Sequence, residues 1–405
     1  MRRGIGWIAA FGILAAAGTG CQERLTGPGE CPELCPGGES PVFDLVLNPL
    51  ANSDTSYTGY VARTSAGALL TSNGLPASED RAVYRFNARA DSIAVRDTLR
   101  PYTVDSALLA VNLIARDTLV NGLKLYLYRI DPAVDIDDTF ESVDAQLLPA
   151  AIIDSIEVPD SVNAGLLQTV IRGADLAKVA LPVGTGGVLA IAVGMAADQP
   201  SGVRLGASAA GTGPSFISYV TLDVPDTGSV RHQSVTRAPA FNATFTRTPV
   251  VPDDAFLTIG GEPSSRALLR FDLPGPIEDS ATIVRATLEL VPVSPLLGLP
   301  TDPPALEARA LFADLGAKSP VVTTDTRFIV ADTLSIGTAD TVRLDVTPIV
   351  RLWQSSTERP DAVFLRLLPE AASFTRPVFG STRSGAVGAP RLRITYLKTF
   401  PFENP

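Results

Sequence analysis

The chain has 405 residues, of which 45% are hydrophobic and 19% are charged. It is long enough to bury two ordinary hydrophobic cores and long for one. Its formal net charge of -10 argues against nucleic acid or an anionic lipid surface as a partner, because both are polyanions that repel an acidic protein. We therefore expect two globular domains and no nucleic-acid partner.

The N-terminal residues have the pattern of a bacterial lipoprotein export signal. Arg2 and Arg3 precede an apolar run over residues 5–17, which is shorter than the roughly 20 residues that cross a bilayer. Small residues then lead into Cys21, which resembles the lipobox cysteine that carries acyl chains. We expect a signal peptide over residues 1–20, a lipid anchor on Cys21 and a location in the cell envelope, at an outer membrane where the host has one. Cleavage by an ordinary signal peptidase followed by secretion is the alternative.

The segment 21–42 is expected to be the lipidated cysteine and a Gly/Pro-rich tether. Within it, Cys31 and Cys35 are expected to form a disulfide, because the chain is exported to an oxidising space. A metal site is the alternative. Zinc takes about four nitrogen or sulfur ligands, and the only histidine, His232, lies far along the chain. We therefore expect no metal and no cofactor.

Beyond residue 42 nearly every segment has the character of a β-strand. Short apolar or alternating runs rich in Val, Ile, Leu, Thr and Tyr are separated by Gly, Pro, Asp and Ser, which predicts antiparallel β-sandwiches rather than an α/β sheet. Strands are expected at residues 106–114, 123–130, 188–193, 283–293, 305–312, 341–346 and 362–368. One short helix is expected over residues 347–354, with Asp345 or Thr347 placed to cap it.

An internal repeat predicts the domain boundaries. The motif Arg-Ala-Val-Tyr-Arg-Phe at residues 81–86 recurs as Arg-Ala-Leu-Leu-Arg-Phe at residues 266–271. The order and spacing of neighbouring segments also agree between the two halves of the chain. We therefore expect two homologous domains, at residues 43–226 and 238–399, joined by a linker over residues 227–237.

The second half also resembles the DNRLRE (disaggregatase-related) domains. The segments that carry the resemblance are residues 266–273, 286–290, 344–353 and 390–392, with Tyr396. The resemblance implies a jelly-roll β-sandwich similar to carbohydrate-binding modules, on a secreted or surface protein. The first half lacks the tryptophan of the 344–353 segment, so its membership rests on the internal repeat. The expected fold class is thus all-β, with two tandem antiparallel, jelly-roll-like sandwiches after a signal peptide and a flexible tether.

The repeated motif supplies the candidate glycan-binding residues, Arg81 and Arg85 with their counterparts Arg266 and Arg270. Alternation along a strand places both arginines of each motif on one face and the phenylalanine on the other. A basic stripe of this kind would bind the carboxylates of an acidic polysaccharide through bidentate guanidinium contacts. The alternative, which the 43 acidic residues of the chain favour, is that the arginines pair with Asp and Glu on neighbouring strands.

Two further features have both a structural and a binding interpretation. Trp353 could stack on a sugar ring, but its helical spacing with Ile349 and Val350 favours a face that packs on a sheet. The acidic run over residues 131–144, which includes Asp135, could hold a structural Ca²⁺. It lacks the glycine and the spacing of an EF-hand loop, which favours a solvated loop.

The sequence contains no recognisable catalytic motif. A single histidine leaves no histidine-centred triad, and there is no nucleophile elbow, phosphate loop or metalloprotease helix. We expect a non-catalytic, membrane-anchored, surface-exposed lipoprotein that binds extracellular or cell-wall glycans. The alternative is a structural or assembly lipoprotein of the cell envelope that contacts protein partners. A hydrolase or lyase with paired carboxylates is the third and weakest interpretation.

Overall fold

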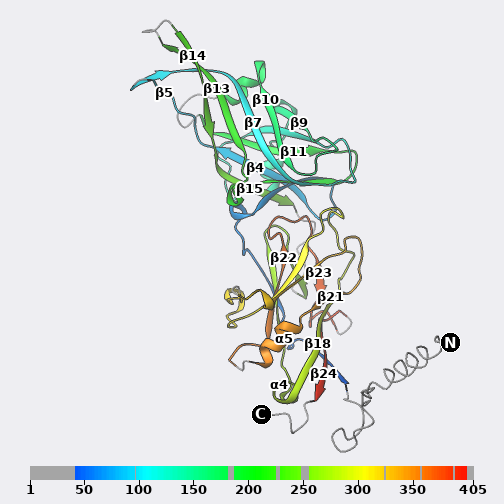
Figure 1. Ribbon diagram of the computed structural model, residues 1–405. Helices are drawn as coiled ribbons and strands as arrows, with labels where there is room; N and C mark the ends of the chain where they lie inside the picture. Colours follow the sequence, from blue (N-terminus) through cyan, green and yellow to red (C-terminus); the bar gives the residue numbers. More distant parts are fainter. Residues whose placement is uncertain are drawn as a thin grey trace, which may run out of the picture.

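The computed structural model describes residues 42–95, 97–180, 187–224, 229–247, 255–322, 325–355, 358–385 and 388–398. This part of the chain consists mostly of antiparallel strands with a few short helices, which confirms the predicted all-β class. Two pairs of sheets lie one beyond the other along the long axis of the molecule (Figure 1). The strands predicted from the alternating pattern are all present.

The first sandwich consists of two sheets that share one core. Its six-stranded sheet has the order β14-β13-β7-β12-β3, with β10 paired to β7. The bounds are β3 Ala68–Asn73, β7 Thr103–Arg116, β10 Gly165–Ile171, β12 Ser201–Gly206, β13 Ser215–Val224 and β14 Ser229–Arg237. The five-stranded sheet has the order β15-β4-β11-β8-β9. The bounds are β4 Glu79–Phe86, β8 Lys124–Ile130, β9 Ile152–Glu157, β11 Leu189–Ala196 and β15 Pro239–Arg247. Phe86 from one sheet and Phe216 from the other meet in the shared core, with their ring centroids 5.6 Å apart.

The second sandwich repeats this plan with a four-stranded sheet, β1-β24-β18-β21, and a five-stranded sheet, β2-β17-β22-β19-β20. The first sheet has the bounds β1 Val42–Leu47, β18 Ala281–Leu290, β21 Val342–Asp345 and β24 Arg391–Lys398. The second has the bounds β2 Thr55–Thr58, β17 Ser265–Arg270, β19 Ala305–Ala310, β20 Ile329–Thr333 and β22 Ala362–Leu368. A short pair, β16 (Phe256–Thr258) and β23 (Val378–Gly380), lies beside them. A smaller hairpin in the first sandwich pairs β5 (Ser92–Val95) with β6 (Thr98–Pro101).

Strand pairing corrects the predicted domain boundaries. β1 and β2 lie at the start of the predicted first domain but pair with β24 and β17 of the second sandwich. The predicted linker, residues 227–237, contains β14, which pairs along its length with β13, and the next strand, β15, pairs with β4. The predicted linker is therefore wrong, and the first sandwich is an insertion between β2 and β16. The repeat identified matching internal strands, but edge strands are assigned by the hydrogen-bond ladder that they complete.

The two sandwiches contact each other through a small mixed interface. Leu70 of the first sandwich packs with Leu299 and Phe374 of the second. Arg204 forms an ion pair with Asp302 at 2.7 Å. These contacts join the two units by both apolar and charged groups.

Helices occupy short connections. α2 (Phe140–Asp144) and α3 (Leu176–Val179) belong to the first sandwich, and α4 (Gly275–Ser280) and α5 (Thr347–Gln354) to the second. α5 has the predicted bounds, but the residue at its N-cap is Val346, which makes no side-chain capping hydrogen bond, rather than Asp345 or Thr347. The Asp345 carboxylate, one residue further out, accepts the Thr347 backbone N–H at 3.1 Å. Trp353 on α5 is 3% exposed, and its ring centroid lies 6.0 Å from that of Phe271. This confirms the core interpretation of Trp353. No helix in the described ranges has the length and apolar character needed to cross a membrane.

Candidate ligand-binding surfaces

The arginines of the first motif are part of the packing over the outer face of their sheet. Arg81 on β4 donates to the Asp144 and Glu79 carboxylates, each at 2.8 Å, and its guanidinium lies over the Phe140 ring. Arg85 donates to the Val134 carbonyl at 2.5 Å and lies over an aromatic ring of β15. Both side chains therefore hold the segment around α2 against the sheet.

The second motif has the same arrangement. Arg266 on β17 makes a bidentate contact with Glu370, at 2.7 and 2.9 Å, and its guanidinium lies 4.2 Å from the centroid of the Tyr60 ring. Arg270 makes a bidentate contact with Asp314 and donates to a backbone carbonyl beside β2. The hydrogen bonds from Arg270 hold the pKa of the Asp314 carboxyl below its usual range.

All four candidate arginines thus have acidic, carbonyl or aromatic partners within the protein. The outer faces of their sheets are covered by small apolar clusters around Val143 in the first sandwich and Phe364 in the second. The arginines therefore do not form an open basic stripe. The ion-pair interpretation describes Arg81, Arg266 and Arg270, whereas Arg85 bonds to a backbone carbonyl and lies over an aromatic ring. Apart from Glu79, which lies two residues from Arg81, the partners named above are distant in the sequence, so no local pattern identifies them.

Other candidate residues are placed as follows. Cys21, Cys31 and Cys35 lie outside the described residues. In the acidic loop, Asp135 accepts the Asp137 backbone N–H at 2.9 Å, and Asp138 accepts the Asp135 backbone N–H and the Ser142 hydroxyl, each at 3.0 Å. Across the described ranges, no group of three or more His, Cys, Asp and Glu side chains is placed to hold a metal ion.

A different surface is open, on the outer face of the six-stranded sheet. The register aligns Tyr219 on β13 with Ser106 on β7 and Ser234 on β14, so these side chains form a row across three strands. Tyr219 is 42% exposed, and its hydroxyl makes no hydrogen bond to any residue in the described ranges. We call this row and the adjacent row of Thr221 and His232 the Tyr219 surface.

A hydrogen-bonded chain occupies the adjacent row. The register shifts between Tyr219 and Val220, and the extra residue on β7 is Asp105. The Thr221 hydroxyl donates to the Asp105 carboxylate at 2.5 Å and lies 3.0 Å from His232 Nδ1. The chain orients these polar groups beside the exposed Tyr219 ring. Alternation along β13 already separates Tyr219 from the buried Phe216, but His232 was expected in a linker, so no local pattern indicated the second row.

The order of this chain differs from that of a catalytic triad. In a triad, the histidine lies between the nucleophile and the carboxylate, takes the hydroxyl proton and is held by the acid. Here the threonine lies between the other two groups and directs its proton toward Asp105. The arrangement is suited to hydrogen bonding with a ligand rather than to activation of a nucleophile.

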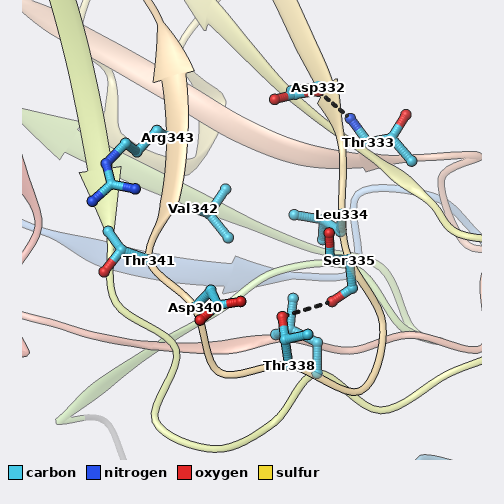
Figure 2. A pocket seen from close by; sticks show the side chains of 10 residues that line it. Asp332, Thr333, Leu334, Ser335, Thr338, Asp340, Thr341, Val342 and Arg343 are labelled. Carbon is cyan, nitrogen blue, oxygen red and sulfur yellow. Dashed lines mark hydrogen bonds between the residues drawn. The ribbon is translucent and has the colours of Figure 1, made fainter.

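A hollow of about 190 Å³ lies between β20 and β21 in the second sandwich (Figure 2). Its wall is mostly polar, and its groups bond to each other: Thr338 donates to the Ser335 carbonyl and the Thr333 N–H donates to Asp332. Arg343, at its edge, forms an ion pair with Glu289. The hollow is below the roughly 300 to 1,000 Å³ of typical ligand pockets, so it carries no functional argument.

Comparison with known proteins gives no family for this chain. No protein-family model matches it, and no curated protein matches it. Its function is therefore argued from the surfaces described above.

Proposed function

We propose that this protein is a non-catalytic, lipid-anchored surface protein of the cell envelope that binds extracellular or cell-wall glycans. The observation that carries the glycan-binding function is the Tyr219 surface, where an exposed aromatic ring lies among hydroxyl groups on a sheet. Membership of the DNRLRE family, the jelly-roll connection of the strands and an outer-membrane location belong to the same proposal.

The chemistry of the Tyr219 surface fits a sugar better than an ionic ligand. A tyrosine ring offers an apolar face to the C–H groups of a pyranose and a hydroxyl for hydrogen bonding. Ser106, Ser234 and the Asp105–Thr221–His232 chain supply donors and acceptors around it. The proposed ligand is therefore a glycan whose ring lies flat on Tyr219.

The strand order supports an outward position for this surface if the chain is anchored at Cys21. The first described strand, β1, belongs to the second sandwich, and in Figure 1 its partner β24 lies at the end of the molecule opposite β14 and β5. A tether of about 20 residues spans up to about 65 Å when extended. A lipid on Cys21 would thus hold the second sandwich nearer the membrane and present the Tyr219 surface outward.

The anchor predicts a clear fractionation result. The mature protein should partition with membranes and label with palmitate, because two or three acyl chains hold a protein stably on a bilayer. Cys21→Ser should abolish both, and a Cys31→Ser variant serves as the thiol control. Partitioning that is unchanged in Cys21→Ser would exclude the lipid anchor.

The Tyr219 surface predicts a loss of binding without a loss of stability. Tyr219→Ala should weaken glycan binding about tenfold, which corresponds to about 1.4 kcal/mol, because the variant loses the apolar area that the ring buries against the sugar. Exposed positions change the free energy of unfolding by about 0.5 kcal/mol or less, so the melting temperature should stay unchanged. A glycan array of neutral and acidic polysaccharides identifies the ligand, and titration of the variants measures the change.

A matched control is available in the second sandwich. Phe312 is also an exposed aromatic residue, at 46%, so Phe312→Ala removes a comparable ring from another surface and should leave binding unchanged. Equal binding by the wild type and Tyr219→Ala, or no glycan bound by the wild type, would contradict the proposed site.

A separate observation supports the alternative function, a structural or assembly lipoprotein. On the same outer face, β10 exposes Leu166 at 55% and Val170 at 45%, and β10 pairs directly with β7. Exposed apolar side chains on one face of a strand supply the apolar area that protein contacts use. Capture of an envelope protein that is lost in a Leu166→Gln, Val170→Gln variant, without any glycan on the array, would favour this function.

A further inference from the structure

A second hollow, of about 590 Å³, lies at one end of the first sandwich, where β8 ends and the short 3₁₀ segment Pro149–Ala151 leads into β9. Its volume lies within the roughly 300 to 1,000 Å³ of pockets that hold small molecules. The lining residues are Arg129, Ile130, Asp131, Pro132, Ala145, Gln146, Leu148, Ala150, Ala151 and Lys178. This hollow uses none of the residues of the Tyr219 surface.

The floor of the hollow is aliphatic. Leu148 is 59% exposed, and the small side chains of Ala145, Ala150 and Ala151 lie around it. An exposed leucine gains free energy when an apolar group covers it and removes it from water. The floor therefore favours a ligand with an aliphatic body.

The polar groups of the rim are held in place by bonds within the protein. Lys178 Nζ donates to the Ile152 carbonyl at 2.5 Å and to Asp175 Oδ1 at 2.8 Å. The Asp131 backbone N–H donates to Gln146 Oε1 at 2.7 Å, and Asp131 Oδ1 accepts a backbone N–H at 2.9 Å. A rim fixed in this way loses little freedom when a ligand binds.

Arg129 is the exception among these groups. It is exposed, and within the described ranges its guanidinium makes no hydrogen bond or ion pair, not even with Asp131 in the same rim. This contrasts with the four motif arginines, all of which are engaged. A free guanidinium offers a planar pair of donors that matches a carboxylate, and the Lys178 ammonium adds a second positive charge to the rim. The Asp131 carboxylate disfavours an anion on its own side of the rim.

We propose that this hollow binds a small aliphatic carboxylate, with the carboxylate on Arg129 and Lys178 and the aliphatic body on Leu148 and the alanines. This goes beyond the proposed glycan binding and does not depend on it. The same chemistry is present in a free branched-chain acid and in the C-terminal leucine of a peptide.

The test compares a carboxylate with its amide. 4-Methylpentanoate is titrated into the full protein and followed by calorimetry, beside 4-methylpentanamide and acetate. We expect 4-methylpentanoate to bind at least tenfold more tightly than the amide, which lacks the charge, and than acetate, which lacks the body. Titration of Gly-Gly-Leu with a free or an amidated C-terminus then shows whether the hollow also binds the C-terminal carboxylate of a peptide or only a free acid.

Two variants make the test specific. Arg129→Met keeps an unbranched apolar side chain and should reduce the affinity for 4-methylpentanoate to that for the amide. Lys124→Met removes one positive charge from the other end of the same strand and should leave the affinity unchanged. Because both residues are exposed or half-exposed, equal melting temperatures show that the variants are folded. No binding of 4-methylpentanoate by the wild type, or equal binding by Arg129→Met and Lys124→Met, overturns the proposal.

Discussion

Trp353→Ala is expected to lower the free energy of unfolding of the second sandwich by about 3 to 5 kcal/mol, as the deletion of a large buried aromatic side chain does. Trp353 is 3% exposed and packs in the main core of the second sandwich, beside Ile349 and Val350 of the same helix. The cavity left behind would remain lined by side chains that cannot all close over it. Chemical denaturation of the full chain measures the loss.

Trp353→Phe is the matched control for this prediction. The indole Nε1 has no hydrogen-bond partner in the described ranges, so its contribution is packing, and a phenylalanine ring keeps part of the contact with Phe271. We expect Trp353→Phe to cost clearly less than Trp353→Ala. A change of less than about 0.5 kcal/mol for the alanine variant, which is typical of surface sites, would show that Trp353 is not a core residue.

Glu262 is expected to make the protein less stable as the pH rises from about 4.5 to above 7. Its side chain is 1% exposed and lies 3.4 Å from Arg63 Nε, and neither carboxylate oxygen has a hydrogen-bond partner in the described ranges. Burial raises the pKa of Glu262 from 4.5 to about 7, against the opposing effect of the Arg63 charge, and the buried Asp80 carboxylate adds to the rise.

The direction of the effect follows from proton linkage. The native state holds the Glu262 proton more tightly than the unfolded state, so the stabilisation is complete below the unfolded pKa and is lost as the pH passes the native pKa. The shift corresponds to about 3 kcal/mol, at 1.36 kcal/mol per pKa unit. Denaturation at pH 5 and pH 8 measures most of this change, about 2.5 kcal/mol, because pH 5 already lies above the unfolded pKa of 4.5.

Glu262→Gln isolates the contribution of this residue. The glutamine does not titrate, so the difference in unfolding free energy between the wild type and Glu262→Gln should shift by about 2.5 kcal/mol between pH 5 and pH 8, in favour of the variant at pH 8. Burial also raises the pKa of Asp80, and the two carboxylates repel each other, so the same comparison is repeated in an Asp80→Asn background, where only Glu262 of this pair titrates. A difference that stays constant with pH would contradict the assignment.

Glu262 lies where the two sandwiches meet, in contact with Arg63. Arg63 lies in the 3₁₀ segment Arg63–Ser65 that leads from β2 into the first sandwich. It donates to the Ile136 and Asp138 carbonyls of the first sandwich and pairs with Glu262 of the second. Neither residue stood out in the sequence, because a single arginine and a single glutamate carry no periodic signal.

Local patterns in the sequence were enough to predict the all-β class, the strands and α5. The period-two alternation of strands and the helical spacing of Ile349, Val350 and Trp353 report which face of each element is buried. The repeat of residues 81–86 at residues 266–271 also predicted equivalent strands, β4 and β17, in the two sandwiches. These properties depend on neighbours within a few residues, which is why they can be read from a single sequence.

The tertiary structure decided which strands complete each sheet and which polar groups remain free. β1 and β14 have ordinary strand sequences, and only their hydrogen bonds to β24 and β13 place them in the second and first sandwich. The motif arginines are engaged because distant residues are brought to them, such as Glu370, 104 positions from Arg266, and Ser53, 217 positions from Arg270. Arg129, in contrast, has no partner among the described residues. Side-chain alternation is a local property of the backbone, but strand pairing and ion pairing depend on contacts between distant segments, and these exist only in the folded chain.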